Sequence, residues 1–247
     1  MLGLWLRSLL FNVGWYVGTA IIAIAGLPIL LLPRHANIAW ADFWIDFCLW
    51  WLKVSCGVTH RVRGLENRPA GPVILACKHQ SSWETLAFHR LFPNAATVLK
   101  RELIFIPVVG WAMARAGNIA VERGDGATAL RSLLRQAKAV VADGRSVLIY
   151  PEGTRTPVGS SLPYHAGTAA LYRQLGVPVV PVALNSGLFW GRRKFVKWPG
   201  LIEVEVLPAI PPGLSREAFM TTLRERIEQA TARLVEQAAA GRQSAER

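Results

Sequence analysis

The stretch Val73–Glu84, with the sequence VILACKHQSSWE, determines how the rest of the chain is organised. Its first residues are apolar and typical of a buried strand, whereas its remainder is typical of a polar turn that opens a helix. His79 in this turn is able to accept a proton near neutral pH, and Glu84 is able to orient the imidazole and stabilise its charge. Residues five apart on a regular helix lie about 140° apart around its axis, so the two side chains meet only if His79 precedes the helix.

This pattern has two interpretations. Ser81 or Ser82 is suited to be the N-cap of the helix, because a hydroxyl accepts a hydrogen bond from a backbone N–H group that has no partner inside the helix. The stretch is then either a capping turn with an incidental histidine or a catalytic base with its acidic partner. Residues elsewhere in the chain have to decide between them.

The composition indicates a protein that works at a membrane surface. The chain has 247 residues, of which 52% are hydrophobic and 10 are Trp, and its mean hydropathy is +0.28. It is too apolar for an ordinary soluble domain, yet its 18% of charged residues exclude a protein of many membrane spans. The net charge of +12 suits nucleic acid or an anionic lipid surface. Abundant Trp beside apolar runs favours lipid.

The three cysteines are Cys48, Cys56 and Cys77. They form neither a metal-like pair nor an even-numbered disulfide framework. We therefore expect a reducing compartment, no structural disulfide and no zinc.

The first hydrophobic segment, Leu9–Pro33, contains no charged residue and is long enough to span a bilayer as a helix. Three glycines and Pro28 interrupt it, so a kinked or shallow helix is the alternative. A cleaved signal peptide is a third interpretation, since Ala23–Ala25 resembles a cleavage site. We discount it because a second apolar segment follows directly.

The second segment, Ile38–Val58, combines six Trp and Phe residues with Asp42 and Asp46, which share one helix face. Two carboxylates argue against a membrane span. We expect an amphipathic helix in the interface with aromatic side chains at headgroup depth. The alternative is a helix buried against the protein's own core. Together the two segments predict a membrane-anchoring helical hairpin over residues 1–58.

Residues 59–240 alternate between short apolar runs and helical patterns, which predicts an α/β fold. We expect a mixed, largely parallel sheet flanked by helices, and a disordered tail over residues 241–247. Strands are predicted at 61–63, 73–77, 96–99, 117–123, 146–150, 177–184 and 202–207. Helices are predicted after His79 and at 128–142, 167–175 and 215–239, with short helices between 100 and 111.

Three predicted strands end in polar residues: His79 with Glu84, then Arg123, then Glu152 with Arg155. In open α/β sheets the chemistry usually lies outside the carboxyl ends of strands. The two arginines are suited to clamp a phosphate, and Glu152 to orient an arginine or bind a hydroxyl. Gly153, which follows Glu152, would let backbone N–H groups approach an anion. The alternatives are a solvated strand end at Arg123 and a plain turn with a salt bridge at 152–155.

Four motifs occur in an order that is specific to one family. They are His79–Glu84, a histidine and an acid separated by four residues; Gly117–Arg123, a glycine followed six residues later by arginine; Pro151–Arg155, PEGTR; and Val179–Val182, an apolar strand with a proline. Lys100–Leu103 and Pro107–Gly110 also look like family segments. Over roughly 60–207 the chain resembles the 1-acylglycerol-3-phosphate acyltransferases of the glycerophospholipid acyltransferase superfamily, in which an N-terminal helical pair is common.

The chain departs from this family's pattern at two positions. Glu84 stands where the family usually has aspartate, so the longer side chain must reach His79 in another rotamer. Lys78 stands where asparagine is frequent. It adds a positive charge next to the base, which either disfavours the protonated imidazole or binds an anionic substrate.

The resemblance implies transfer of an acyl group from acyl-CoA or acyl carrier protein to a lysophospholipid hydroxyl. The expected acceptor is 1-acylglycerol 3-phosphate (lysophosphatidic acid) and the expected product phosphatidic acid. His79 would be the general base and Glu84 its partner. Arg123 and Arg155 would hold the acceptor's phosphate, and the other expected substrate-binding residues are Lys100, Glu152, Gly153 and Thr154.

The implied reaction needs no metal, cofactor or covalent enzyme intermediate. An oxyanion hole is expected, but the sequence does not identify its donors. The expected partners are membrane lipids and the two substrates, not nucleic acid. The expected location is the cytoplasmic face of the cell membrane, the inner membrane if the source is bacterial.

A basic cluster, Arg192, Arg193, Lys194 and Lys197, either attracts the anionic donor or lipid headgroups or is a solvated loop. Other functions also fit parts of the sequence. They are an acyltransferase for another lysolipid, such as lyso-ornithine lipid, and a membrane lipid-binding protein with an inactive site. Net charge alone suggests a nucleic-acid-binding domain, but no base-reading module is recognised.

Overall fold

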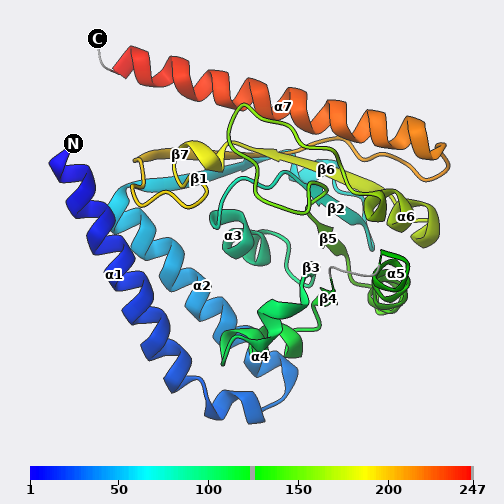
Figure 1. Ribbon diagram of the computed structural model, residues 1–247, viewed down its shortest axis with the longest axis horizontal. Helices are drawn as coiled ribbons and strands as arrows, with labels where there is room; N and C mark the ends of the chain where they lie inside the picture. Colours follow the sequence, from blue (N-terminus) through cyan, green and yellow to red (C-terminus); the bar gives the residue numbers. More distant parts are fainter. Residues whose placement is uncertain (123–125, 246–247) are drawn as a thin grey trace.

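The computed structural model describes the backbone of residues 1–122 and 126–245 and the side chains of residues 1–122 and 126–240. Within these residues the chain forms an N-terminal helical hairpin and a seven-stranded sheet with helices on both faces (Figure 1). Arg123 lies outside the described residues, so its role in a phosphate site stays a prediction.

The hairpin consists of α1 (Leu2–Ala25) and α2 (Arg34–Cys56), joined by the 3-10 helix η1 (Pro28–Leu31). Gly14 and Gly18 do not interrupt α1; they make room for aromatic rings of α2. A Cβ atom at Gly14 would lie 2.2 Å from the Trp51 ring, and one at Gly18 would lie 2.4 Å from the Phe47 ring. Residues without a Cβ therefore let the two helices pack closely.

Three tryptophans of α2 point into the hairpin rather than out of it. Their indole N–H groups donate hydrogen bonds to α1, from Trp40 to the Ile22 carbonyl, from Trp44 to Thr19 Oγ1 and from Trp51 to the Phe11 carbonyl. These three rings pack against the protein itself, which agrees with the alternative interpretation of this segment as a helix buried against the protein's own core. The outward-facing aromatic residues of α2 are Phe43 and Trp50, which are about half exposed.

The two carboxylates of α2 face the sheet domain. Arg90 on α3 (Trp83–Leu91) donates to Asp42 at 2.8 Å and to Asp46 at 2.9 Å. One arginine thus bridges both acids, which explains why an apolar helix carries them. This contact ties the hairpin to the domain that contains His79.

The outer face of α1 is apolar and uncovered. The helix is long and apolar enough to cross a membrane, and only 11% of its most hydrophobic window is buried. Leu6, Leu10, Val17, Ile21 and Ile24 are each more than half exposed. A continuous apolar surface of this kind indicates a hydrophobic partner and supports membrane association.

The sheet has the strand order β1-β7-β6-β2-β5-β3-β4. Neighbouring strands are parallel except for the antiparallel pair β6 and β7, which confirms the predicted mixed, largely parallel sheet. The strands are β1 (Val58–Arg63), β2 (Ile74–Cys77), β3 (Ala96–Lys100), β4 (Ile119–Val121), β5 (Val147–Ile149), β6 (Val179–Leu184) and β7 (Gly200–Val206).

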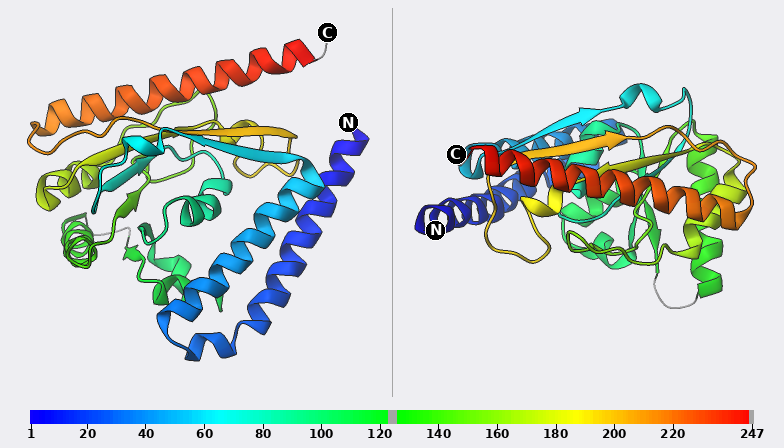
Figure 2. Two further views of the ribbon diagram at one scale, coloured as in Figure 1. Left: turned by 180° about the vertical axis from the view of Figure 1, so that it is seen from behind. Right: turned by 90° about the horizontal axis from the view of Figure 1, so that it is seen from above.

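The helices lie on both faces of the sheet (Figure 2). The hairpin and α3 share one hydrophobic core with one set of strand residues, whereas α5, α6 and α7 share the other core. The further elements are η2 (Leu65–Asn67), η3 (Arg101–Phe105), α4 (Val109–Arg115), α5 (Gly126–Ala142), α6 (Ala166–Leu175), η4 (Ser186–Leu188) and α7 (Arg216–Ala245). The helix α7 continues to Ala245, beyond residue 241 at which the sequence predicts a tail.

The alternation of side chains along β2 decides where Lys78 and His79 point. Leu75 and Cys77 belong to the core on the α3 side, whereas Ile74 and Ala76 belong to the core on the α7 side. Because successive strand residues face opposite sides of a sheet, Lys78 continues toward α7 and His79 toward α3. Two adjacent polar residues therefore serve two different sides of the molecule.

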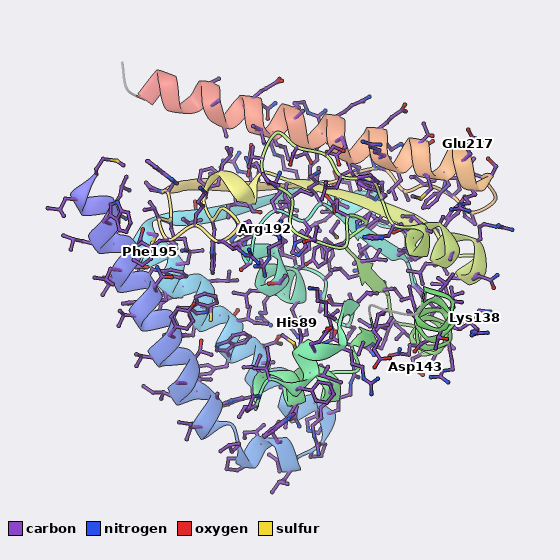
Figure 3. All side chains as sticks on the ribbon, viewed as in Figure 1. His89, Lys138, Asp143, Arg192, Phe195 and Glu217 are labelled. Atoms are coloured by element: carbon purple, nitrogen blue, oxygen red, sulfur yellow. The ribbon has the colours of Figure 1, made fainter. Side chains whose placement is uncertain are left out.

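The basic cluster at 192–197 does not form a single charged surface, because Lys197 is buried at 3% exposure. Its ammonium donates to the carbonyls of Lys194 and Phe195 and lies over the Phe11 ring. Burial lowers the pKa of Lys197 to about 8. Phe195 of the same loop lies beside α1, where it stacks on Trp5 (Figure 3). This loop therefore fastens α1 to the sheet domain.

Candidate active site

His79 and Glu84 meet as the spacing requires, with His79 in the turn before α3 and Glu84 in the first turn of the helix. The imidazole Nδ1 lies 2.9 Å from Glu84 Oε1. Since a carboxylate accepts hydrogen bonds, the proton of the imidazole lies on Nδ1 in this contact and Nε2 is the basic nitrogen. The side chain of His79 is 12% exposed and that of Glu84 is fully buried.

Glu84 holds the whole turn together as well as the histidine. Its Oε1 accepts the backbone N–H groups of Gln80 at 2.6 Å and Ser81 at 2.5 Å, and its Oε2 accepts the Ser186 hydroxyl at 2.7 Å. Four donors around one buried carboxylate supply the partners that a buried negative charge needs.

The two serines of the motif have different tasks. Ser82 occupies the N-cap position without a side-chain cap bond, and the Ser81 hydroxyl accepts the Trp83 N–H at 3.0 Å. The N-cap serine therefore makes no side-chain cap bond, and Ser81 and Glu84 accept the backbone N–H groups of this turn.

The imidazole is also held from the side of its ring. Tyr150 stacks on it with ring centroids 4.1 Å apart, and the tyrosine hydroxyl donates to the Glu84 carbonyl at 3.3 Å. Burial raises the pKa of the Tyr150 phenol well above its usual value. The backbone of His79 is fixed by Thr156, whose N–H and hydroxyl both donate to the His79 carbonyl. An imidazole fixed in this way has little freedom to change its orientation.

The segment Gly153–Arg155 approaches the histidine from β5. Gly153 has a φ of 62°, and its N–H donates to the Tyr150 carbonyl at 2.9 Å, which closes the turn. Thr154 and Arg155 are half-buried. The Arg155 guanidinium lies close enough to Tyr150 to lower the pKa of that phenol against the larger effect of burial. Arg155 is thus a cation within electrostatic range of Tyr150, the residue that stacks on His79.

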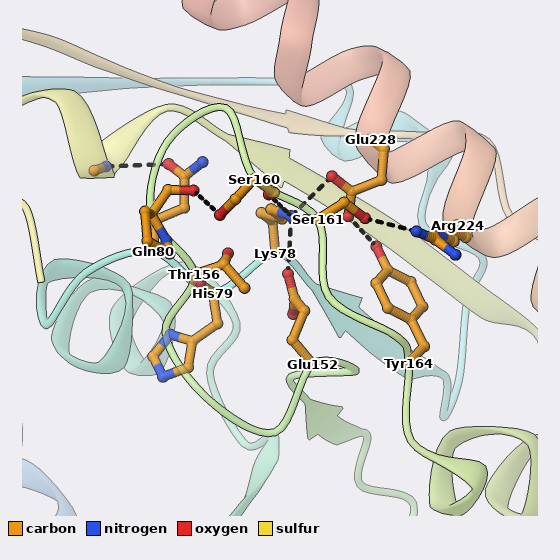
Figure 4. A network of polar contacts seen from close by, with 12 residues as sticks. Lys78, His79, Gln80, Glu152, Thr156, Ser160, Ser161, Tyr164, Arg224 and Glu228 are labelled. Carbon is orange, nitrogen blue, oxygen red and sulfur yellow. Dashed lines mark hydrogen bonds and ion pairs between the residues drawn. The ribbon is translucent and has the colours of Figure 1, made fainter.

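Glu152 points away from the histidine. Its carboxylate is fully buried and lies 3.1 Å from Lys78 Nζ, and Lys78 in turn donates to both carboxylate oxygens of Glu228 on α7 at 2.8 Å. Tyr164 also donates to Glu228 (Figure 4). The lysine is completely buried, so it does not reach a substrate, and the predicted role of Lys78 in binding an anionic substrate is wrong.

Lys100 is the last residue of β3 and is exposed at the same edge of the sheet. It lies in register with Val121 of β4, two residues before the undescribed Arg123. The sheet therefore brings the carboxyl ends of the strands that carry His79, Arg155 and Lys100 to one edge.

Two residues of this site were not identified from the sequence. Ser186 follows β6, the strand next to β2, and Tyr150 follows β5, its other neighbour. The rule that located His79 also locates them, because both come directly after a buried strand. The sequence did not show that β5 and β6 are the two neighbours of β2 in the sheet, which is what brings these residues to His79 and Glu84.

The sequence matches the acyltransferase family model over residues 59–185. It is 41% identical to the 1-acyl-sn-glycerol-3-phosphate acyltransferase of Pseudomonas aeruginosa over 199 residues, 80% of this chain and 77% of that protein. The chain belongs to this acyltransferase family. The recognition of the family from its motifs is thereby confirmed.

More distant relatives agree with this assignment. The human 1-acyl-sn-glycerol-3-phosphate acyltransferase alpha is 29% identical over 87% of this chain and 80% of that protein. The fold is similar to the crystal structure of the 1-acyl-sn-glycerophosphate (LPA) acyltransferase from Thermotoga maritima, with a TM-score of 0.73 at 23% identity over 93% of this chain and 95% of that chain.

The acyltransferase should lose activity when Glu84 is replaced by aspartate, the residue that the 1-acylglycerol-3-phosphate acyltransferases usually have at this position. Glu84 serves His79, two backbone N–H groups and Ser186 at once, and a carboxylate one methylene shorter cannot reach all four from the same backbone. We expect Glu84→Asp to lower kcat about tenfold or more, a loss of the order that one misplaced catalytic hydrogen bond causes. Steady-state rates with saturating substrates measure this. An unchanged kcat would show that the extra methylene has no role.

Proposed function

We propose that the protein transfers a fatty acyl group from a thioester to the sn-2 hydroxyl of 1-acylglycerol 3-phosphate and so forms phosphatidic acid. The observation that carries the proposal is the contact between the buried Glu84 and His79 Nδ1, which leaves Nε2 as a base. It is supported by the sequence relatives whose names state this activity.

The proposed reaction proceeds by direct attack. As the acceptor hydroxyl attacks the thioester carbonyl, His79 Nε2 takes its proton, because an alcohol is far too weak an acid to ionise beforehand. Glu84 stabilises the resulting imidazolium. The tetrahedral intermediate then collapses, the C–S bond breaks, and the leaving thiolate receives the proton from the imidazolium. Atoms and charge balance without a covalent enzyme intermediate.

The acceptor's phosphate is proposed to lie between the cations at the sheet edge. Arg155 lies near Tyr150 and Lys100 ends β3, and Arg123, which lies outside the described residues, is proposed to complete the set. Glu152 is buried against Lys78 and is not part of this proposed phosphate site, whereas Gly153 shapes the turn that carries Arg155. Thr154 remains a proposed substrate contact beside them.

The hairpin, residues 1–58, is proposed to hold the domain of residues 59–240 on the cytoplasmic face of the membrane. The exposed apolar face of α1 supports this, because the acceptor and the product both reside in the bilayer. The donor, acyl-CoA or acyl carrier protein, then arrives from the aqueous side.

The test is thiol release from a long-chain acyl-CoA or acyl carrier protein in the presence of 1-acylglycerol 3-phosphate. We expect turnover that requires the acceptor and yields phosphatidic acid. Lyso-ornithine lipid and lysophosphatidylethanolamine serve as comparison acceptors. Turnover only with those would move the assignment to another lysolipid, and folded, membrane-bound protein that is inactive with every donor and acceptor would favour a lipid-binding protein.

A further inference from the structure

A second apolar surface lies outside the hairpin, on the segment that follows β3. Leu103 and Phe105 of η3, Ile106 of the following turn and Trp111 of α4 form what we call the η3–α4 patch. Their exposed fractions are 37%, 66%, 45% and 46%. Neither the proposed reaction nor the packing of the sheet explains why four large apolar side chains of one short segment face outward.

The backbone of this segment is tight and strained. Val108, a β-branched residue, has a φ of 62°, which such residues rarely adopt. A Cβ at Gly110 would lie 2.3 Å from the Leu103 carbonyl oxygen, and the Gly110 N–H donates to the Ile106 carbonyl at 2.8 Å. Strain that the surrounding structure maintains is typical of functional segments. Here the exposed Phe105 and Ile106 directly precede the strained residue.

The patch belongs to a segment that lies beside the tip of the hairpin. Arg34 at the start of α2 donates to the Ala116 carbonyl at 2.9 Å, and Arg115 of α4 donates to the Leu32 carbonyl at 3.4 Å. Leu31 at the tip is 85% exposed. Figures 1 and 2 both show α4 beside this tip. The η3–α4 patch and the exposed apolar residues of α1 and η1 therefore lie on neighbouring elements.

The residues around the patch are mostly basic and suit an anionic lipid surface. Lys100, Arg101, Arg115 and Arg34 are exposed around it, and Glu102 is the one carboxylate between residues 100 and 115. Arg101 is already paired with Glu122. Exposed Trp and Phe flanked by arginine and lysine are characteristic of side chains that enter the headgroup region of a bilayer.

We propose that the η3–α4 patch inserts into the headgroup region of an anionic bilayer as a second membrane contact beside the hairpin. The inference rests on the proposed membrane anchoring of the hairpin. A helix that contacts a membrane alone leaves the attached domain free to tilt. A second contact directly after Lys100 fixes the sheet edge at headgroup depth, where the phosphate of a membrane-embedded acceptor lies.

The insertion can be measured with a fluorophore placed at single cysteines of the full chain. The native cysteines are free and buried, so a nitrobenzoxadiazole label reacts with an introduced thiol. The positions are Phe105→Cys in the patch, Ile21→Cys on the outer face of α1, and Leu214→Cys just before α7 as the water-exposed control. The labelled proteins are bound to the outside of vesicles of phosphatidylethanolamine and phosphatidylglycerol and treated with dithionite, which reduces label that is in contact with water.

We expect the labels at 105 and 21 to be protected from dithionite and the label at 214 to react. Protection at 21 with a fast reaction at 105 would overturn the inference and leave the hairpin anchor intact. A fast reaction at both 105 and 21 on vesicle-bound protein would overturn the anchor together with the inference.

A pair of substitutions tests the energetic contribution of the patch. We expect Phe105→Ser with Trp111→Ser to weaken binding to the same vesicles about tenfold or more, because two large apolar side chains are lost from the lipid contact. The matched control is Leu162→Ser with Leu214→Ser, two exposed leucines elsewhere, which should bind as wild type. Equal circular-dichroism melting curves establish folding, and equal vesicle binding by both pairs would contradict the proposal.

Discussion

Replacing His79 with alanine is expected to lower kcat about 100- to 10,000-fold, the range that a general base contributes. His79 is the proposed base, which Glu84 orients, and Tyr150 and Thr156 fix its ring and backbone. Alanine removes Nε2, so the acceptor hydroxyl has no group to take its proton during attack on the thioester. The measurement is thiol release with saturating donor and acceptor.

The controls separate this loss from misfolding. His165→Ala removes an exposed imidazole just before α6 and should leave kcat unchanged. Because His79→Ala removes one of the four donors to the buried Glu84, its melting temperature should fall modestly. Its vesicle binding and its circular-dichroism spectrum should match those of wild type, because the backbone contacts of the turn persist. Residual activity within tenfold of wild type would require a different base.

Replacing Lys78 with methionine is expected to destabilise the fold by about 3–5 kcal/mol, the cost of removing one partner from a buried ion pair. Lys78 is completely buried between Glu152 and Glu228. Methionine fills a similar volume but leaves Glu152 without its cation, in a site where both of its oxygens already have no hydrogen-bond partner within the described residues. Chemical denaturation monitored by circular dichroism measures the change in the free energy of unfolding.

Variants of the neighbouring groups test this explanation. Glu152→Gln keeps Lys78 paired with Glu228 and should destabilise the fold less than Lys78→Met does. The double variant should be more stable than Lys78→Met alone, because it no longer buries an unpaired carboxylate at that position. Lys138→Met on the exposed surface of α5 (Figure 3) should have little effect. A loss of equal size for Lys138→Met would contradict the assignment.

The effect of Lys78→Met should depend on pH in a defined direction. Burial, followed by the charge of Glu228, raises the pKa of Glu152 above 4.5, and Lys78 counteracts this rise. A carboxyl group whose pKa is higher in the folded than in the unfolded state destabilises the fold when it ionises. The free energy of unfolding therefore decreases as the pH rises from 4.5 through the folded-state pKa. Without Lys78 that pKa rises further, and the destabilisation should be larger at pH 8 than at pH 5.

The local features of the site could be predicted from the sequence. The spacing of His79 and Glu84 required the histidine to precede the helix, and it does so. The apolar runs predicted β2, β5 and β6, whose carboxyl ends surround the site. These inferences succeeded because strand burial, helix starts and an i to i+5 contact depend on residues that are close in the chain.

Other features of the site depend on contacts between distant residues. Pro151–Arg155 looked like one substrate-binding motif, yet Glu152 turns to the buried Lys78, whereas Arg155 is half-buried and within electrostatic range of Tyr150. Lys78 finds a partner 150 residues away on α7. The glycines of α1 looked like helix interruptions and instead accommodate rings of α2.

The sequence by itself therefore determined the family, the α/β class, the apolar hairpin and the paired histidine and acid, because each is encoded in residue type and short spacing. Only the tertiary structure decided the strand order that brings Ser186 to Glu84, the partner of Lys78, and the outward display of the η3–α4 patch. The physical reason is that buried charges and apolar surfaces are stabilised by whichever groups the fold brings within contact distance. Separation along the chain does not specify that distance.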